Sequence, residues 1–200
     1  MSDYNRKDHY YKKAKEDGFR SRAAFKLEQL QKKYKLIKNG AHVLDLGCSP
    51  GGFLQVTAEA AGPKGRVVGV DLLPLKPLNE YPHIHFILGD GRDSAVQSAI
   101  RDAIGDYADV VLSDMAPNTS GVKHLDHARS VELAQVALQI AARFLKNGGS
   151  MLIKLFEGDE LKDFQAEAAQ YFGKIDLHRP EATRKGSNEI YLIARQFKKQ

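Results

Sequence analysis

HVLDLGCSPGGF, residues 42–53, combines a short apolar run, a glycine-rich turn and the start of a helical pattern. Gly47, Gly51 and Gly52 let the backbone turn tightly and approach a ligand without a clash from a Cβ atom. The helical pattern that follows, GFLQVTAEAAG, offers backbone N–H donors in its first turn. The stretch therefore predicts a strand, a ligand-binding loop and a helix, which together form the first unit of an α/β sheet.

Strand-like runs alternate with helical patterns on both sides of this stretch. Seven strands are expected, at HVLDL, RVVGVDL, IHFILGD, ADVVLSD, SMLIKLF, KIDLHR and NEIYLIARQF. Several of them are apolar on both faces, as in a parallel sheet that helices cover. We therefore predict an α/β, doubly wound, Rossmann-like fold with a mostly parallel sheet. No helical pattern separates the last two runs, so the last strand is expected to run antiparallel.

Two helix boundaries carry specific signals. In FRSRAAFKLEQLQKKY, Ser21 is a candidate N-cap, because a serine hydroxyl can accept a hydrogen bond from a free N–H of the first turn. The long helical pattern LDHARSVELAQVALQIAARFLKNGG is expected to end at Gly148, since glycine often follows the last helical turn.

Length and composition indicate one globular domain over residues 1–200. Hydrophobic residues make up 42% of the chain and charged residues 28%, close to the globular average, which disfavours disorder. The single cysteine, Cys48, excludes an intramolecular disulfide framework and fits a reducing compartment. The polar start lacks the apolar core of a signal peptide, and no run reaches the roughly 18 apolar residues of a membrane span. We expect a cytoplasmic protein with no membrane partner.

Positive charge is concentrated at the amino terminus. Residues 1–40 contain 12 Lys or Arg and 5 Asp or Glu, a net charge of +7 (12 − 5). The whole chain carries +5, so residues 41–200 carry −2 (5 − 7). A basic, tyrosine-bearing segment on a near-neutral body indicates a polyanionic partner, most simply nucleic acid. A solvated lysine-rich helical face is the alternative interpretation.

Acidic residues at strand ends indicate a nucleotide-like ligand. Asp71 ends the second expected strand, where a carboxylate can accept hydrogen bonds from both hydroxyls of a ribose. Asp90 ends the third, in a position suited to an adenine edge. The glycine spacing G-x-x-x-G-G differs from the dinucleotide fingerprint G-x-G-x-x-G, which favours S-adenosylmethionine over a dinucleotide. Phe53, directly after the glycines, is expected to pack against the loop or the ligand.

A second group of charged residues follows the later strands. Asp114 ends the fourth strand, Lys154 lies within the apolar fifth run MLIKLF, and Glu189 begins the last strand. A buried ammonium group costs several kcal/mol unless it is paired, so we expect these three side chains to meet. Lys154 is then either a reactive group or an ion-paired residue of the core.

The sequence resembles the FtsJ/RrmJ family of ribosomal RNA ribose 2′-O-methyltransferases. The resemblance rests on RSRAAFKL, DLGCSPGGF, DLLP, GDGRD, SDMAPNTSG, LIKLFEG and SNEIYLIA, which occur in the family's order over residues 9–196. It implies a seven-stranded, S-adenosylmethionine-dependent methyltransferase fold with an antiparallel last strand. It also implies the substrate class, because the family methylates RNA.

The resemblance implies roles for individual residues. The family's catalytic tetrad falls on Lys26, Asp114, Lys154 and Glu189. Its cofactor contacts fall on Gly51, Phe53, Asp71, Asp90 and Asp114. Where Phe53 stands, the family often has tryptophan, so the aromatic character is kept.

The chemistry of ribose methylation accounts for these residue types. A ribose hydroxyl holds its proton tightly, so a correctly placed base adds typically about 10²–10⁴-fold in rate. We hypothesise that Lys154 accepts this proton, that Asp114 and Glu189 hold its amine, and that Lys26 steers the ribose or its phosphate. Arg20 and Arg22, with the amino-terminal lysines of residues 1–40, are candidates for contacts with RNA phosphates.

The expected substrate is a uridine in the A-loop of 23S rRNA in the large (50S) ribosomal subunit, and the expected oligomeric state is a monomer. Alternatives are ribose methylation of tRNA or of an mRNA cap, and a non-catalytic RNA-binding factor for ribosome assembly. The glycine spacing disfavours a nicotinamide-dependent dehydrogenase. The histidines show no metal-ligand spacing with cysteine, so no metal is expected, and we interpret them as surface or loop residues.

Overall fold

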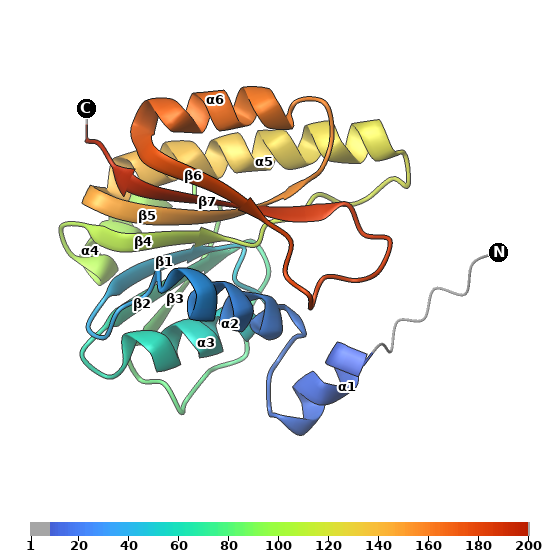
Figure 1. Ribbon diagram of the computed structural model, residues 1–200. Helices are drawn as coiled ribbons and strands as arrows, with labels where there is room; N and C mark the ends of the chain where they lie inside the picture. Colours follow the sequence, from blue (N-terminus) through green and yellow to red (C-terminus); the bar gives the residue numbers. More distant parts are fainter. Residues whose placement is uncertain (1–8, 200) are drawn as a thin grey trace.

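The computed structural model describes residues 9–199, whose seven strands form one sheet in the order β3-β2-β1-β4-β5-β7-β6 (Figure 1). The strands are β1 (His42–Leu46), β2 (Arg66–Asp71), β3 (Ile84–Leu88), β4 (Ala108–Ser113), β5 (Leu145–Phe156), β6 (Phe172–His178) and β7 (Glu189–Phe197). The helices are α1 (His9–Glu16), α2 (Ala23–Tyr34), α3 (Gly52–Ala61), α4 (Ser94–Ile104), α5 (Lys123–Phe144) and α6 (Leu161–Tyr171).

The strand directions confirm the predicted doubly wound α/β sheet. β1 pairs in parallel with β2 and β4, β2 with β3, and β4 with β5. β7 lies between β5 and β6 and runs antiparallel to both, so the last strand is inserted as the second arm of a hairpin. The carboxyl ends of the parallel strands therefore lie along one edge, where such sheets bind ligands.

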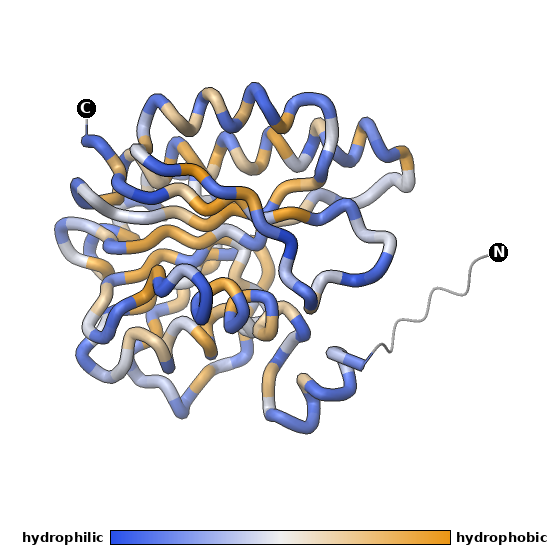
Figure 2. The backbone as a smooth tube through the Cα atoms, viewed as in Figure 1, coloured by the Kyte–Doolittle hydropathy of each residue, from blue (hydrophilic) through white to orange (hydrophobic). Residues whose placement is uncertain are grey.

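Helices cover both faces of the sheet. Leu44 and Leu46 of β1 point into a core shared with α4, α5 and α6, whereas Val43 points into a core shared with α2 and α3. This alternation follows from the two-residue period of a strand. Figure 2 shows the consequence, because hydrophobic residues gather along the central strands and polar residues lie on the outer surfaces. Among residues 9–199, no helix is long and apolar enough to cross a bilayer.

The prediction for the end of the long helix was wrong. α5 ends at Phe144, and β5 begins at the next residue rather than after Gly148. Leu145 pairs with Ala108 of β4, and the register then shifts before Val110 pairs with Ser150. The helix therefore ends because Leu145 pairs with β4, and Gly148 adopts a left-handed φ of 79° in the irregular stretch before Ser150.

The predicted cap of α2 was also wrong. The N-cap position is Arg22, without a side-chain cap hydrogen bond, and the Ser21 carbonyl accepts the Ala24 N–H at 3.2 Å. The Ser21 side chain instead lies against Gly52, where a Cβ atom would come within 2.2 Å of its Oγ. The beginning of α2 is thus packed directly on the glycine-rich loop, and glycine at position 52 is required by this close approach.

One histidine departs from the prediction of surface or loop positions. His127 is buried in α5, and its Nδ1 lies 2.8 Å from the Phe156 carbonyl oxygen. Its Nε2 accepts a hydrogen bond of 3.1 Å from the Glu160 N–H. His127 therefore joins α5 to the end of β5, two residues beyond Lys154. No local pattern predicted this role, because the two segments are distant along the chain.

Asp45 lies fully buried in the middle of β1, and neither of its carboxylate oxygens has a hydrogen-bond partner among the described residues. Burial, and then the charges of Asp114 and Asp71, raise the pKa of the Asp45 carboxyl well above its ordinary value. A buried carboxyl without partners is disfavoured as an anion. Asp45 is therefore held in its protonated form.

We predict that Asp45→Asn does not lower the free energy of unfolding at pH 7. In the wild type, the folded state keeps a proton on Asp45 that the unfolded chain releases, so stability falls as pH rises above the unfolded pKa. Each pH unit in this window removes about 1.4 kcal/mol, and asparagine has no such loss. Urea unfolding at pH 5, 6 and 7 should show the difference growing in favour of Asp45→Asn. The exposed Asp102→Asn is the control; equal pH dependence in wild type and Asp45→Asn would contradict the prediction.

Candidate active site

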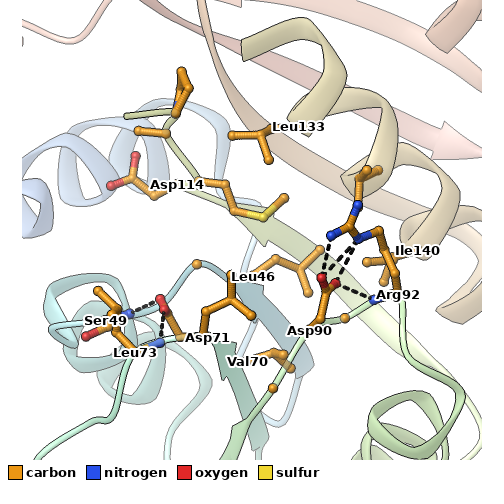
Figure 3. A pocket seen from close by; sticks show the side chains of 18 of the residues that line it. Leu46, Ser49, Val70, Asp71, Leu73, Asp90, Arg92, Asp114, Leu133 and Ile140 are labelled. Carbon is orange, nitrogen blue, oxygen red and sulfur yellow. Dashed lines mark hydrogen bonds and ion pairs between the residues drawn. The ribbon is translucent and has the colours of Figure 1, made fainter. Parts of the chain in front are cut away.

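A cavity of about 720 Å³ opens at the carboxyl ends of β1, β2, β3 and β4 (Figure 3). Three of the residues predicted from the sequence line it, Asp71, Asp90 and Asp114. Each follows or ends a different strand, so the parallel sheet brings together residues that are far apart in the chain. The cavity has the size of a small-molecule site, since such sites measure about 300–1,000 Å³.

Asp71 is held in place by backbone donors. Its Oδ2 accepts a hydrogen bond of 2.8 Å from the Ser49 N–H, and its Oδ1 accepts one of 2.8 Å from the Leu73 N–H. Figure 3 shows these two bonds at the floor of the cavity. Each carboxylate oxygen has a second lone pair, so both remain able to accept from a pair of vicinal hydroxyls.

Asp90 lies in the cavity beside an arginine. The Arg92 Nε is 3.0 Å from both Asp90 oxygens, and the Arg92 backbone N–H donates to Oδ1 at 2.9 Å (Figure 3). The side-chain and backbone hydrogen bonds from Arg92 lower the pKa of the Asp90 carboxyl. Asp90 is therefore an ionised acceptor, as an adenine amino group requires, and Arg92 is a neighbour that the sequence analysis did not assign.

The glycine-rich loop is constrained by the chain that follows β4. Gly47 has a φ of 73°, and a Cβ atom there would lie 2.6 Å from the Cγ of Met115, which lines the cavity. Gly51 has a φ of 111° and caps α3, but it lines neither this cavity nor the smaller one beside it. Phe53 lines that smaller cavity of about 190 Å³, together with Asp114. The predicted cofactor residues thus divide between two adjoining cavities and the cap of α3.

Two leucines add apolar surface to the larger cavity. Leu72 and Leu73 follow Asp71 and line the cavity, and they are among the most exposed large hydrophobic residues described, at 69% and 63%. Adjacent exposed apolar side chains that line a cavity are suited to contact with an apolar part of a ligand. A flat aromatic ligand such as adenine would cover them.

Asp114 is the meeting point of three strands. The Lys154 Nζ from β5 lies 3.0 Å from the Asp114 Oδ1 and also donates to the Asp114 backbone carbonyl. The Tyr191 hydroxyl from β7 donates to the same Oδ1 at 2.8 Å, and the Asp114 N–H donates to the Leu46 carbonyl of β1 at 3.2 Å. Lys154 and Tyr191 are cross-strand neighbours, which explains why both side chains reach the same carboxylate.

Glu189 has a different partner from the one predicted. It forms an ion pair with Lys26 of α2, and both side chains are largely buried. The Lys26 Nζ also lies 5.9 Å from the centre of the Tyr191 ring. The structure thus brings all four predicted tetrad residues together, but as two ion pairs, Lys154 with Asp114 and Lys26 with Glu189. The predicted contact of Glu189 with the amine of Lys154 is replaced by its pair with Lys26.

The charges around Asp114 fix its protonation state. Burial alone would raise the pKa of the Asp114 carboxyl, but the charges of Lys154 and Lys26 and the hydrogen bonds from Tyr191 and Lys154 lower it below its ordinary value. Burial, and then the charges of Asp114 and Glu189, raise the pKa of Tyr191 well above its ordinary value. Asp114 is therefore an anion, and the Tyr191 hydroxyl keeps its proton and donates it.

Tyr191 was not predicted from the sequence; it is fully buried and stacked on Phe53 with ring centres 6.5 Å apart. A signal was available, because Tyr191 follows Glu189 by two residues and therefore lies on the same face of a strand.

Among residues 9–199, no group of three or more histidine, cysteine, aspartate or glutamate side chains is placed to hold a metal ion.

Arg20 and Arg22 contact the protein's own backbone. The Arg20 guanidinium donates to the Lys76 carbonyl and, at 2.5 Å, to the Pro77 carbonyl. The Arg22 guanidinium donates to the Ala182 carbonyl. Both arginines therefore join the start of α2 to other loops. These backbone contacts explain the presence of Arg20 without a contact to phosphate.

We predict that Gly47→Ala weakens binding of S-adenosylmethionine by tenfold or more. The new methyl group would force Met115 away from the cavity wall, in addition to the roughly 1–2 kcal/mol that a left-handed backbone costs a residue with a Cβ atom. Calorimetric titration of the variant measures the dissociation constant. Gly148→Ala has a similar φ of 79° with nothing within 4 Å, so it controls for backbone strain alone. Equal cofactor affinity in the two variants would contradict the prediction.

Comparison with known proteins places this site in a family. The chain matches the family described as FtsJ-like methyltransferase over residues 19–197. A protein of Methanothrix thermoacetophila named ribosomal RNA large subunit methyltransferase E is 47% identical over 193 residues, which are 96% of this chain and 74% of that protein. The protein of the same name from Myxococcus xanthus is 43% identical over 190 residues, which are 95% of this chain and 89% of that protein.

Solved structures agree with the fold. A ribosomal RNA methyltransferase from Plasmodium falciparum has a TM-score of 0.82 at 28% identity, over 91% of this chain and 100% of that one. Fibrillarin from Aeropyrum pernix, solved with bound S-adenosyl-L-methionine, has a TM-score of 0.60 at 19% identity, over 86% of this chain and 75% of that one, which shows a shared fold. With the predicted Rossmann-like sheet confirmed and the match extending over most of the sequence, the chain belongs to the FtsJ-like methyltransferase family.

Proposed function

We propose that the protein transfers a methyl group from S-adenosylmethionine to the 2′-hydroxyl of a ribose in large-subunit ribosomal RNA. The observation that carries this proposal is the buried pair of Lys154 and Asp114, because Asp114 lines both the larger and the smaller cavity. A binding protein has no need for a buried lysine at such a place, whereas removal of a hydroxyl proton requires a base. The names of the curated relatives support the same reaction class and substrate.

The cavities fit the proposed cofactor. Asp71 offers acceptors for ribose hydroxyls, Asp90 offers an anionic acceptor for the adenine amino group, and Leu72 and Leu73 offer apolar surface for the ring. Phe53 and Asp114 line the smaller cavity, which would take the amino-acid end. Asp114 is an anion, so it also attracts a cationic sulfonium or ammonium group.

When bound there, S-adenosylmethionine would supply a methyl group whose sulfonium sulfur keeps the electron pair of the broken C–S bond and leaves as a neutral thioether. The ribose oxygen would form the new C–O bond, and the neutral amine of Lys154 would accept its proton. Asp114 orients this amine through two contacts, from Oδ1 and from the backbone carbonyl. Tyr191 keeps the carboxylate in place by donating to the same oxygen.

Lys26 and Glu189 would position the ribose. Their ion pair lies beside Tyr191, on the side of α2, so a nucleotide entering the site meets Lys26 next to the Lys154–Asp114 pair. We assign Lys26 to the ribose or its neighbouring phosphate, and Glu189 to holding Lys26. Correct alignment of the reacting atoms contributes much of the rate in such transfers.

We further propose a uridine in the A-loop of 23S rRNA as the target, methylated on the 50S subunit by a monomer in the cytoplasm. The basic segment of residues 1–40, with a net charge of +7 (12 − 5), supports a polyanionic substrate. The part of it that lies within residues 1–8 is outside the described residues. The described part includes α1 and α2, and Lys26 lies in α2.

We predict that Lys154→Ala and Lys154→Arg each lower the single-turnover methylation rate by about 10²–10⁴-fold. Arginine keeps a positive charge beside Asp114 but stays protonated. The Lys154→Arg variant therefore keeps an ion-pair partner for Asp114 while it removes the proton acceptor. Affinity for S-adenosylmethionine is measured separately by calorimetry. Lys162→Ala, an exposed lysine of α6, is the control. Near wild-type rates in Lys154→Arg would show that Lys154 is not the base.

We predict that Asp71→Asn raises the dissociation constant of S-adenosylmethionine by about tenfold to a hundredfold. The amide loses the charge that strengthens hydrogen bonds from the ribose, which are worth about 1.5–3 kcal/mol to an ionised acceptor. Titration calorimetry with the cofactor and with S-adenosylhomocysteine measures the effect. Asp102→Asn, exposed on α4, should bind like wild type, and unchanged affinity in Asp71→Asn would remove Asp71 from the cofactor site.

The substrate is tested with a radiolabelled methyl donor and purified large subunits, naked rRNA or tRNA, followed by mapping of the methylated nucleotide. We expect label on the 2′-oxygen of a uridine of the large-subunit RNA. Label on tRNA alone would overturn the ribosomal assignment. Tight cofactor binding without label on any RNA would favour a non-catalytic RNA-binding factor.

A further inference from the structure

The loop of residues 179–188, between β6 and β7, lies beside the amino-terminal helices (Figure 1). Ala182 in this loop is fully buried against Phe25 of α2 and Ala14 of α1. The Ala182 carbonyl accepts a hydrogen bond from Arg22, and its N–H donates to the Gln29 Oε1 at 3.2 Å. The loop is therefore fixed to the same helix that carries Lys26.

The carboxyl end of the loop is fixed as well. The Arg179 guanidinium donates to the Ser187 carbonyl across the base of the loop and pairs with Glu157 at 2.7 Å. The Glu157 N–H donates to the Asn188 carbonyl at 2.7 Å, one residue before Glu189. Glu189 then pairs with Lys26. The loop thus has a defined position at the edge of the tetrad, since it is attached at its middle and at its end.

The loop is positively charged, although one of its cations, Arg179, is paired with Glu157. Its sequence, RPEATRKGSN, contains three Lys or Arg and one Glu, a net charge of +2 (3 − 1). Lys185 is exposed at the tip, and Arg184 is half-buried next to it. The Arg22 guanidinium donates to the Ala182 carbonyl, two residues before Arg184. Burial, and then the charge of Arg184, lower the pKa of Arg22, whereas the charge of Glu189 raises it.

Cations that converge from two separate segments favour an anion between or beside them. Arg22 comes from the start of α2 and Arg184 from the loop, and Lys26 lies one helical turn beyond Arg22. A phosphodiester suits such a group, because guanidinium groups bind phosphate oxygens in a bidentate manner and keep their charge at every relevant pH. The nucleotide whose ribose reaches Lys154 must place its flanking phosphates near this edge.

We propose that the 179–188 loop is a second RNA-contacting segment, in which Arg184 and Lys185 bind phosphates that flank the methylated ribose. This proposal rests on the proposed RNA methyltransferase function and extends it. The substrate strand would then lie between α1 and α2 on one side and this loop on the other. RNA binding was predicted from the sequence only for residues 1–40, because the loop approaches that segment only in the folded protein.

The test compares wild type with the double variant Arg184→Ala, Lys185→Ala in methylation of purified large subunits. We expect KM for the subunit to rise roughly tenfold or more, because two charge-assisted contacts are lost. The slope of log affinity against log salt should become shallower by about 1.5. The affinity for S-adenosylmethionine should stay unchanged. The charge-preserving variant Arg184→Lys, Lys185→Arg should recover most of the affinity for the subunit.

The matched control is Lys174→Ala, Lys198→Ala. It removes two exposed lysines near the ends of β6 and β7 that lie away from the 179–188 loop. It should leave KM unchanged. An equal rise in KM for both double variants would show that the loss of two positive charges anywhere on the surface causes the effect, and it would overturn the proposal. A loss of cofactor affinity in the Arg184, Lys185 variant would assign these cations to the cofactor carboxylate instead. Thermal unfolding of each variant checks that the loop remains folded.

The loop can also be tested when methylation fails. Fluorescence anisotropy with a fluorescein-labelled A-loop fragment measures binding directly. If wild type binds this RNA but methylates neither the fragment nor the purified large subunit, the proposed reaction falls, and the loop is supported only if the Arg184, Lys185 variant binds more weakly. If wild type methylates RNA and the variant has the same KM and the same salt dependence, the loop proposal falls and the proposed function stands.

Discussion

The buried pair of Lys154 and Asp114 is the constraint on which the site depends. Two charges withdrawn from water cost several kcal/mol each unless their geometry is well satisfied. The sheet supplies that geometry, since β4 presents Asp114, β5 presents Lys154 and β7 presents the Tyr191 hydroxyl. The antiparallel insertion of β7 beside β5 is therefore more than a topological detail, because it places Tyr191 next to Lys154.

Two functional regions meet at this pair. On one side, the carboxyl ends of β1, β2 and β3 form a cavity with fixed carboxylate acceptors. On the other side, α2 brings Lys26, and the loop after β6 ends at Glu189. Asp114 lines both cavities and pairs with Lys154, so it links the region suited to the cofactor with the lysine proposed to accept the ribose proton. Transfer between two ligands requires such a shared boundary.

The sequence predicted the fold and the carboxylates well because their positions follow from local pattern. Residues that end parallel strands share one edge of the sheet, so Asp71 and Asp90 could be placed without knowledge of any contact. The partner of Glu189, the backbone carbonyls that bind Arg20 and the burial of His127 could not be predicted. Each of these depends on two segments that meet only after folding, and a side chain carries no local sign of its distant partner.

The pH dependence of the single-turnover methylation rate tests the central claim most directly, with RNA and cofactor both saturating. If Lys154 accepts the hydroxyl proton, only enzyme with a neutral amine reacts, and the rate rises with pH until it levels off. A lysine amine is ordinarily protonated below about pH 10, so a clear rise in rate is expected between pH 6 and pH 9. A rate that is flat over this range, in an enzyme that remains folded and saturated, would contradict it.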